Sequence, residues 1–267
     1  MPFATHLDGR IEYFVRGSGP PLMLVGGVGD TADLWEDHGY VDALSPHFTT
    51  IAVNPRGYGG SSPITELEHL PYALYRDDLH AVIDDFGAEQ VAVMGYSRGG
   101  ILSTALATEY PGRVSALVVG GANLGRSLTY REDAVAQAAR TGGRPWYHPR
   151  RVAGRIRRRL QPGRYASASR WRPVLEQHGI PMHEAWDRYI RPVADIDRAV
   201  ERLSMPVLFF QGDQDLTFDL GETRALVERL QDGHLEVIAN ANHEVIHEPE
   251  RVLSVVTPFL LQSAGLG

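Results

Sequence analysis

The stretch that decides the fold reads Val91-Ala92-Val93-Met94-Gly95-Tyr96-Ser97-Arg98-Gly99-Gly100. The apolar run over 90–94 predicts a buried strand, and the pattern over 101–110 predicts a helix. Between them stands Gly-x-Ser-x-Gly, and this order of strand, pentapeptide and helix is typical of a nucleophile elbow that holds Ser97 above a sheet. Glycines are expected at 95 and 99 because a Cβ there would collide with the neighbouring strand or helix. The alternative is a glycine-rich turn with an incidental serine.

The amino-acid composition limits the classes of protein to which the chain can belong. The 267 residues are 43% hydrophobic and 22% charged, which is ordinary for a globular α/β domain with a large core. The chain has no cysteine, which excludes disulfides, thiolate metal ligands and cysteine nucleophiles. Neither a signal peptide nor an apolar run of about 18 residues is visible, so we expect a cytoplasmic protein without a membrane partner. All 26 basic residues are arginine, a bias that favours a GC-rich bacterial source.

Strands and helices alternate on both sides of the elbow. Before it, the pattern predicts a hairpin turning at Asp8-Gly9, strands at 11–15, 21–25 and 49–53, one helix through Leu34, Trp35 and Leu44, and a helix closed by Gly87. After it, strands are predicted at 114–119, 207–210 and 235–238, and helices at 220–230 and around 252–259. Such repeated β–α units predict a doubly wound, mostly parallel α/β sheet of about eight strands.

The alternation is interrupted over 123–198, where six prolines separate short helical stretches. We interpret this segment as a helical cap inserted into a core domain of residues 1–122 and 199–267. The cap holds 16 arginines against 7 acidic residues, although the whole chain carries a net charge of −7. Either the cap attracts an anionic or carrier-bound substrate, or its arginines form a solvated face that pairs with the acidic body; we favour the second. The acidic net charge and the lack of a binding motif argue against a nucleic-acid partner.

Two later loops supply partners for a serine nucleophile. A serine hydroxyl needs a general base, and the base needs a carboxylate to orient it. The strand at 207–210 is followed by a loop that holds Asp213 and Asp215, with Asp219 a little beyond. The strand at 235–238 is followed by His243 in a loop of small residues. The order serine, aspartate, histidine suits three loops at the carboxyl ends of parallel strands.

These motifs resemble the α/β-hydrolase superfamily, and the resemblance covers essentially the whole chain. The acid loop is similar to the family's Gly-x-x-Asp, which implies Asp215 as the acid. His243 is followed by Glu248-Pro249, as in the family's base loop. Residues 54–61 look like the family's Asp-x-Arg-Gly-x-Gly-x-Ser, with Asn54 in place of the aspartate. The resemblance implies a triad of Ser97, Asp215 and His243; Arg56, Ser61 and His247 are interpreted as structural or supporting residues.

An oxyanion hole requires two N–H groups aimed at the tetrahedral intermediate. We expect one from Arg98, which follows the nucleophile, and the resemblance implies Val28 for the other. The family commonly has His-Gly where this chain has Gly26-Gly27, and that histidine usually braces the loop. Its replacement predicts either a less rigidly held donor and weaker activity, or a glycine-rich oxyanion loop like that of some esterases.

The resulting hypothesis is a serine hydrolase that cleaves an ester or lactone of a small molecule through an acyl-enzyme. Other hydrolases on the same fold are a C–C bond hydrolase and a cofactor-free haloperoxidase or perhydrolase. A second class of function is a non-hydrolytic cyclase or acyl-transfer catalyst, and a third is a ligand-binding protein without turnover. Trp35, Trp146 and Trp186 are candidates for lining the substrate pocket. Histidines and carboxylates do not cluster at ligand spacing, so we expect neither a metal nor a cofactor.

Overall fold

A computed structural model describes residues 1–123, 171–185, 188–189 and 200–267. In these residues the chain forms one eight-stranded sheet with the order β1-β2-β4-β3-β5-β6-β7-β8. The strands are β1 (Phe3–His6), β2 (Gly9–Arg16), β3 (Pro21–Val25), β4 (Thr49–Val53), β5 (Val91–Tyr96), β6 (Val114–Gly120), β7 (Val207–Gly212) and β8 (Gly233–Ile238). β2 runs antiparallel to β1 and β4, and every pair from β4 to β8 is parallel. The predicted mostly parallel sheet of about eight strands is confirmed.

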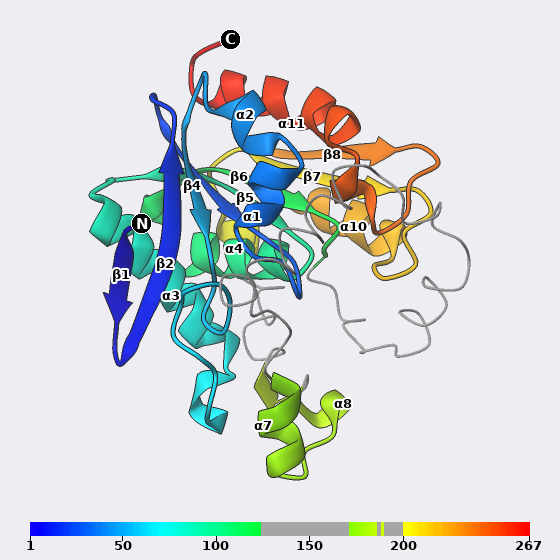
Figure 1. Ribbon diagram of the computed structural model, residues 1–267. Coiled ribbons are helices and arrows are strands. Elements are labelled where there is room, and N and C mark those ends of the chain that lie inside the picture. The colour runs from blue at the N-terminus through cyan, green and yellow to red at the C-terminus, as the bar shows by residue number, and fades with distance from the viewer. Residues whose placement is uncertain (124–170, 186–187, 190–199) are drawn as a thin grey trace.

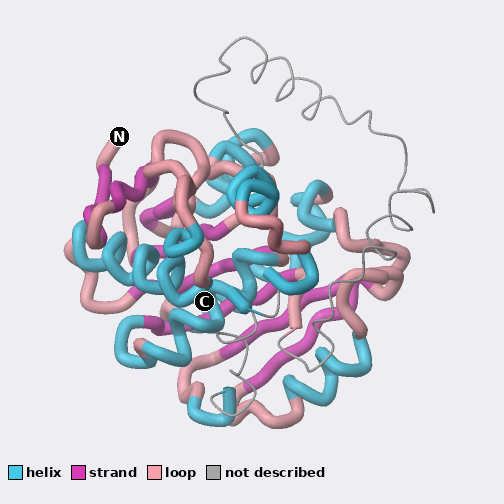
Figure 2. Tube along the Cα trace, turned by 90° about the horizontal axis from the view of Figure 1, so that it is seen from below, coloured by secondary structure: helices cyan, strands magenta, loops and turns pink. Residues whose placement is uncertain are grey.

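Helices cover both faces of the sheet (Figures 1 and 2). The described helices are α1 (Asp33–Asp37), α2 (Tyr40–Leu44), α3 (Tyr72–Phe86), α4 (Arg98–Glu109), α7 (Trp171–Gln177), α8 (Met182–Ala185), α10 (Leu220–Val227) and α11 (Pro249–Ser263), of which α7 and α8 lie apart from the sheet (Figure 1). Short 3-10 turns lie at η1 (Leu67–His69), η2 (Pro111–Arg113), η5 (Val200–Arg202) and η6 (Val245–His247). None of the described helices is long and apolar enough to cross a membrane.

Alternation along the strands divides the core between the two faces. In β5, Val91 and Val93 pack in the cluster under α3 and α4, whereas Ala92 and Met94 pack in the cluster under α1, α2 and α11. Successive side chains of a strand point to opposite faces, so an uninterrupted apolar run fits a strand covered on both sides. This is why the central strands read as continuous hydrophobic stretches.

The first hairpin turns one residue earlier than predicted. His6 pairs with Gly9, so the two-residue loop is Leu7-Asp8 rather than Asp8-Gly9, and Leu7 has a φ of 51°. Gly9 belongs to β2 instead. A Cβ on Gly9 would lie 2.2 Å from Nη2 of Arg56, so this glycine serves a close approach of the arginine rather than the turn.

The single helix predicted through Leu34, Trp35 and Leu44 is wrong. Gly39 adopts a φ of 80° and separates α1 from α2. Glycine reaches this left-handed region without the penalty that a Cβ imposes, so the chain can end one helix and begin another there.

The predicted cap lies largely outside the described residues, and the division into core and cap stays a prediction. Its described part includes α7 and α8. At the start of α7, Trp171 packs edge-on against Tyr72 with ring centroids 5.5 Å apart, and its Nε1 donates to the Tyr75 hydroxyl at 3.0 Å. These contacts attach α7 to the first turn of α3.

Candidate active site

Ser97 occupies the turn between β5 and α4 in a strained conformation, with φ 52° and ψ −119°. A Cβ on Gly95 would lie 2.3 Å from the Gly99 carbonyl oxygen, and one on Gly99 would lie 2.1 Å from the Val25 carbonyl oxygen. The collisions expected for both glycines are therefore present. Because strand and helix approach this closely, the serine is the residue that takes up the strain, as at many functional sites.

The structure brings Ser97, His243 and Asp215 together. His243 Nε2 lies 3.1 Å from Ser97 Oγ, and His243 Nδ1 lies 2.9 Å from Asp215 Oδ2. An ionised carboxylate only accepts hydrogen bonds, so the imidazole proton sits on Nδ1 and Nε2 is left to accept the serine proton. The Asp215 side chain is 1% exposed, and its other oxygen, Oδ1, accepts from the backbone N–H groups of Thr217 at 2.8 Å and Phe218 at 3.3 Å.

The other acidic residues of this region have separate partners. Asp213 Oδ1 accepts from the Ala241 N–H at 3.2 Å, and Asp219 Oδ1 accepts from the Glu222 N–H at 2.9 Å at the start of α10. Geometry therefore favours Asp215 over both alternatives. His247 does not face Ser97: its Nδ1 lies 3.0 Å from His38 Nε2.

Tyr96 holds the histidine loop, a role that the sequence reasoning missed. Its hydroxyl donates to the His243 carbonyl oxygen at 2.6 Å, and the rings of Tyr96 and Phe218 each lie 5.7 Å from the imidazole. Burial raises the pKa of Tyr96 well above 10.0, so its hydroxyl keeps its proton and remains a donor at neutral pH. A tyrosine inside the elbow gives no local sign of this contact with a residue 147 positions away.

The two expected oxyanion donors belong to segments next to the serine. Arg98 begins α4, and Val28 lies in the loop after β3 with 60% of its surface exposed. A Cβ on Gly27 would lie 3.4 Å from Ser97 Cβ, which puts this loop beside the nucleophile. Within the described residues, neither the Val28 N–H nor the Arg98 N–H has a hydrogen-bond partner.

Gly26 leaves little room for the side chain of the histidine common in the family. A Cβ at Gly26 would lie 3.0 Å from Asp30 Cβ, and Asp30 Oδ2 accepts from the Gly27 N–H at 3.2 Å. Asp30 therefore occupies the space beside Gly26 and ties down the loop from within.

The buried Glu12 carboxylate explains why position 54 holds an asparagine where the family commonly has an aspartate. Its Nδ2 donates to Glu12 Oε2 at 2.7 Å, and its Oδ1 accepts from the Ala32 N–H at 2.7 Å. An aspartate in this place would set a second carboxylate against Glu12, which is 6% exposed. Ser61 Oγ donates to the Asn54 carbonyl oxygen at 2.6 Å, and Arg56 pairs with Asp78 at 2.9 Å, so the bonds of both residues are internal to the scaffold.

Trp35, predicted to line the substrate pocket, has no exposed surface and packs edge-on against Tyr40 with ring centroids 5.2 Å apart. Direct contact with a substrate would require this core to rearrange. Trp146 and Trp186 lie outside the described residues, and their role stays a prediction.

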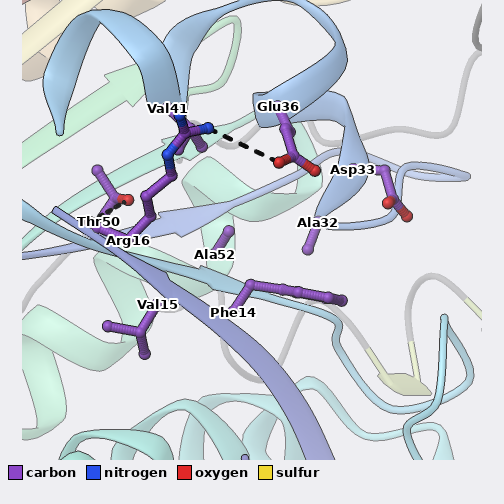
Figure 3. A pocket seen from close by; sticks show the side chains of 9 residues that line it. All are labelled: Phe14, Val15, Arg16, Ala32, Asp33, Glu36, Val41, Thr50 and Ala52. Carbon is purple, nitrogen blue, oxygen red and sulfur yellow. Dashed lines mark hydrogen bonds and ion pairs between the residues drawn. The ribbon is translucent and has the colours of Figure 1, made fainter. Parts of the chain in front are cut away.

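A pocket visible in Figure 3 lies away from the triad, between α1 and α2 and the strands β2 and β4. It is lined by Phe14, Val15, Arg16, Ala32, Asp33, Glu36, Val41, Thr50 and Ala52. Arg16 pairs across it with Glu36 at 3.8 Å. It contains no residue of the Ser97 site.

Comparison with known proteins shows the family. The family model described as alpha/beta hydrolase fold matches residues 20–250, and the chain belongs to this family. A poly(3-hydroxyalkanoate) depolymerase of Ectopseudomonas oleovorans is 26% identical, covering 91% of this chain and 84% of that protein. A 2-(acetamidomethylene)succinate hydrolase of Mesorhizobium japonicum is 28% identical, covering 94% and 92%. The structure of an enol-lactonase from Burkholderia xenovorans LB400 is similar with a TM-score of 0.67 and 18% identity, covering 97% and 99%. The protein is an α/β-hydrolase enzyme with a small-molecule substrate.

Proposed function

We propose that the protein hydrolyses a carboxylic ester or lactone through an acyl-enzyme on Ser97, with His243 as the base and Asp215 as its orienting acid. The observation that carries this proposal is the unbroken series of contacts from Ser97 Oγ through the imidazole to the Asp215 carboxylate, at 3.1 and 2.9 Å. Contacts of this length suit proton transfer between a nucleophile and its base.

The reaction follows from these positions. His243 Nε2 removes the Ser97 proton as Oγ forms a bond to the carbonyl carbon, and the carbonyl electron pair moves to the oxygen. The Val28 and Arg98 N–H groups stabilise that oxyanion, an effect worth about 100- to 1,000-fold in rate for one donor. The tetrahedral intermediate collapses and breaks the bond to the alcohol oxygen, which takes the proton from His243. Water then gives a proton to His243 as it attacks the acyl carbon, and the second tetrahedral intermediate breaks the bond to Ser97 Oγ, which takes that proton back from His243 as the acid is released.

Two of the similar proteins support ester chemistry. The depolymerase and the enol-lactonase are named for ester-type substrates, and the succinate hydrolase is named for an acidic one. An acidic substrate would also suit the excess of arginines in the predicted cap. The alternatives on this fold, C–C bond hydrolysis, perhydrolysis and cyclisation, differ in which bond is broken or made.

Covalent labelling tests the proposal directly. We expect a fluorophosphonate probe to modify Ser97 stoichiometrically, as located by peptide mass spectrometry, and to fail on Ser97→Ala and His243→Ala. The wild type should turn over a p-nitrophenyl ester, with activity at least about 1,000-fold lower in Ser97→Ala.

Ser115→Ala is the matched control because Ser115 is an exposed residue of β6 outside the site. It should label and turn over like the wild type. Labelling at another residue, or equal labelling of the His243→Ala variant, would contradict the proposed nucleophile and base. Labelling of Ser97 without ester or lactone turnover would favour one of the other bond chemistries.

A further inference from the structure

The loop after β3 is held by side chains on both sides of the Val28 amide. Gly27 N donates to Asp30 Oδ2 at 3.2 Å, and Gly29 N donates to the Tyr58 hydroxyl at 3.4 Å. The Val28 N–H between them has no partner in the part of the chain that the structure describes. The hydrogen bonds of the two neighbouring amides limit the rotation of the Val28 peptide plane and leave the Val28 N–H available to a ligand.

Tyr58 is itself firmly placed. Tyr58 is buried, with 1% of its surface exposed. Its backbone N–H donates to the Pro55 carbonyl at 3.0 Å, and its carbonyl accepts from the Ser61 N–H at 3.0 Å. These turns fix the segment 55–61, so the hydroxyl reaches the Gly29 N–H from a rigid base.

Arg98 packs its guanidinium over the ring of Tyr58. Its guanidinium carbon lies 4.4 Å from the Tyr58 ring centroid, and the residue is 4% exposed. Among the described residues, Nε and Nη2 have no hydrogen-bond partner, and burying a cation without such partners is costly. The aromatic face partly compensates, because a cation over a ring is attracted more strongly when water is excluded.

These contacts link the two expected oxyanion donors through one aromatic ring. The side chain of Arg98, whose own N–H is one donor, packs on Tyr58, and Tyr58 ties the loop that carries the other donor. We propose that Tyr58, held by Arg98, is a positioning residue for the Val28 amide and takes the place of the missing loop histidine at Gly26. The inference rests on the proposed function, because it requires an oxyanion to form at Ser97.

Tyr58→Phe tests this role with the smallest change. It removes the hydroxyl that accepts from Gly29 and keeps the ring under Arg98. We expect kcat for a p-nitrophenyl ester to fall about tenfold with KM unchanged, because the Val28 donor remains but is less well aimed; losing it would cost more. A trifluoromethyl ketone forms a tetrahedral adduct on serine that carries the oxyanion. Its inhibition constant should rise by the same factor.

Tyr13→Phe is the matched control. The Tyr13 hydroxyl donates to Asp85 Oδ2 at 2.7 Å, so the variant also loses one tyrosine hydrogen bond, away from the loop. Its kcat and ketone affinity should equal those of the wild type. Arg98→Met, which keeps the backbone N–H, should shift kcat and ketone affinity in the same direction as Tyr58→Phe.

The outcomes separate this inference from the proposed function. A wild type that neither labels at Ser97 nor turns over esters would overturn both. If the wild type is active and Tyr58→Phe keeps the kcat and ketone affinity of Tyr13→Phe, the role of Tyr58 alone is wrong. A Tyr58→Phe variant that loses melting temperature or raises KM while kcat and ketone affinity hold would likewise show a structural role only.

Discussion

Asp215 uses both of its carboxylate oxygens, and this decides what an amide in its place would do. Oδ2 accepts from His243, and Oδ1 accepts from the Thr217 and Phe218 N–H groups. An asparagine has a single acceptor oxygen. The two backbone donors would hold that oxygen, so the NH₂ group would face His243 Nδ1 and force the imidazole proton onto Nε2. His243 would then be unable to accept the Ser97 proton.

Asp215→Asn is therefore expected to lower kcat for ester hydrolysis by about 10,000-fold, as in triads where the wrong histidine tautomer is imposed. Steady-state kinetics with a p-nitrophenyl ester would measure it. Asp213→Asn is the control, because its Oδ1 can still accept from Ala241, and its kcat should stay within a few-fold of the wild type. An Asp215→Asn variant within tenfold of the wild type would exclude Asp215 as the orienting acid.

At the scale of the elements, the elbow depends on how closely α4 approaches β3. A Cβ on Gly99 would lie 2.1 Å from the Val25 carbonyl oxygen and 2.6 Å from its carbon. Both atoms are backbone atoms of a central strand that is paired on both sides, so neither can move without disturbing the sheet. The helix would have to shift away and carry Ser97 with it.

Gly99→Ala should consequently lower the free energy of unfolding by about 3 kcal/mol, the upper end of the range typical of overpacking, because this site cannot relax. Urea denaturation would measure the change. Gly112→Ala is the matched variant, since a Cβ there meets nothing within 4 Å, and it should unfold within about 0.5 kcal/mol of the wild type. Equal stability of the two variants would show that the close approach at Gly99 does not limit the fold.

The elbow and the two partner loops could be predicted because their signals are local and their order is imposed by the sheet. The Gly-x-Ser-x-Gly motif marks β5 and α4, and parallel strands bring the loops of Asp215 and His243 to one edge. The break at Gly39 could not be read, because a glycine inside an apolar helical pattern is often tolerated.

The contacts of Tyr58 and Tyr96 could not be predicted for a different reason. Tyr58, in the loop after β4, reaches Gly29 in the loop after β3, and Tyr96 reaches His243 across 147 positions. Such contacts depend on how loops meet after the sheet has formed, and no spacing in the sequence encodes them. The packing of Trp35 against Tyr40 likewise joins two residues that lie on either side of the helix break at Gly39.

Over the whole molecule, tyrosines are buried on both faces of the sheet. Tyr72 and Tyr75 belong to the core under α3 and α4, and Tyr40 and Tyr96 to the core under α1, α2 and α11. Burial raises the pKa of all four phenols above the ordinary value of 10.0, because a phenolate loses its hydration inside the core. The folded chain therefore keeps protons that the unfolded chain would release.

This difference in proton binding predicts alkaline unfolding. The free energy of unfolding is unaffected by these phenols below pH 10.0. It falls as the pH rises above this value, because only the unfolded state then releases the phenol protons. Phenolate absorbance and circular dichroism, followed together, should show the four tyrosines ionising only as secondary structure is lost. Tyr75→Phe should reduce the phenolate absorbance that appears in that step by the contribution of one tyrosine. Tyr147→Phe removes a tyrosine that lies outside the described residues, and its difference from the wild type gives the pH at which that tyrosine ionises. Full ionisation of the tyrosines near pH 10.0 with unchanged circular dichroism would contradict the burial of these side chains, because a phenolate that forms without unfolding must already be in contact with water.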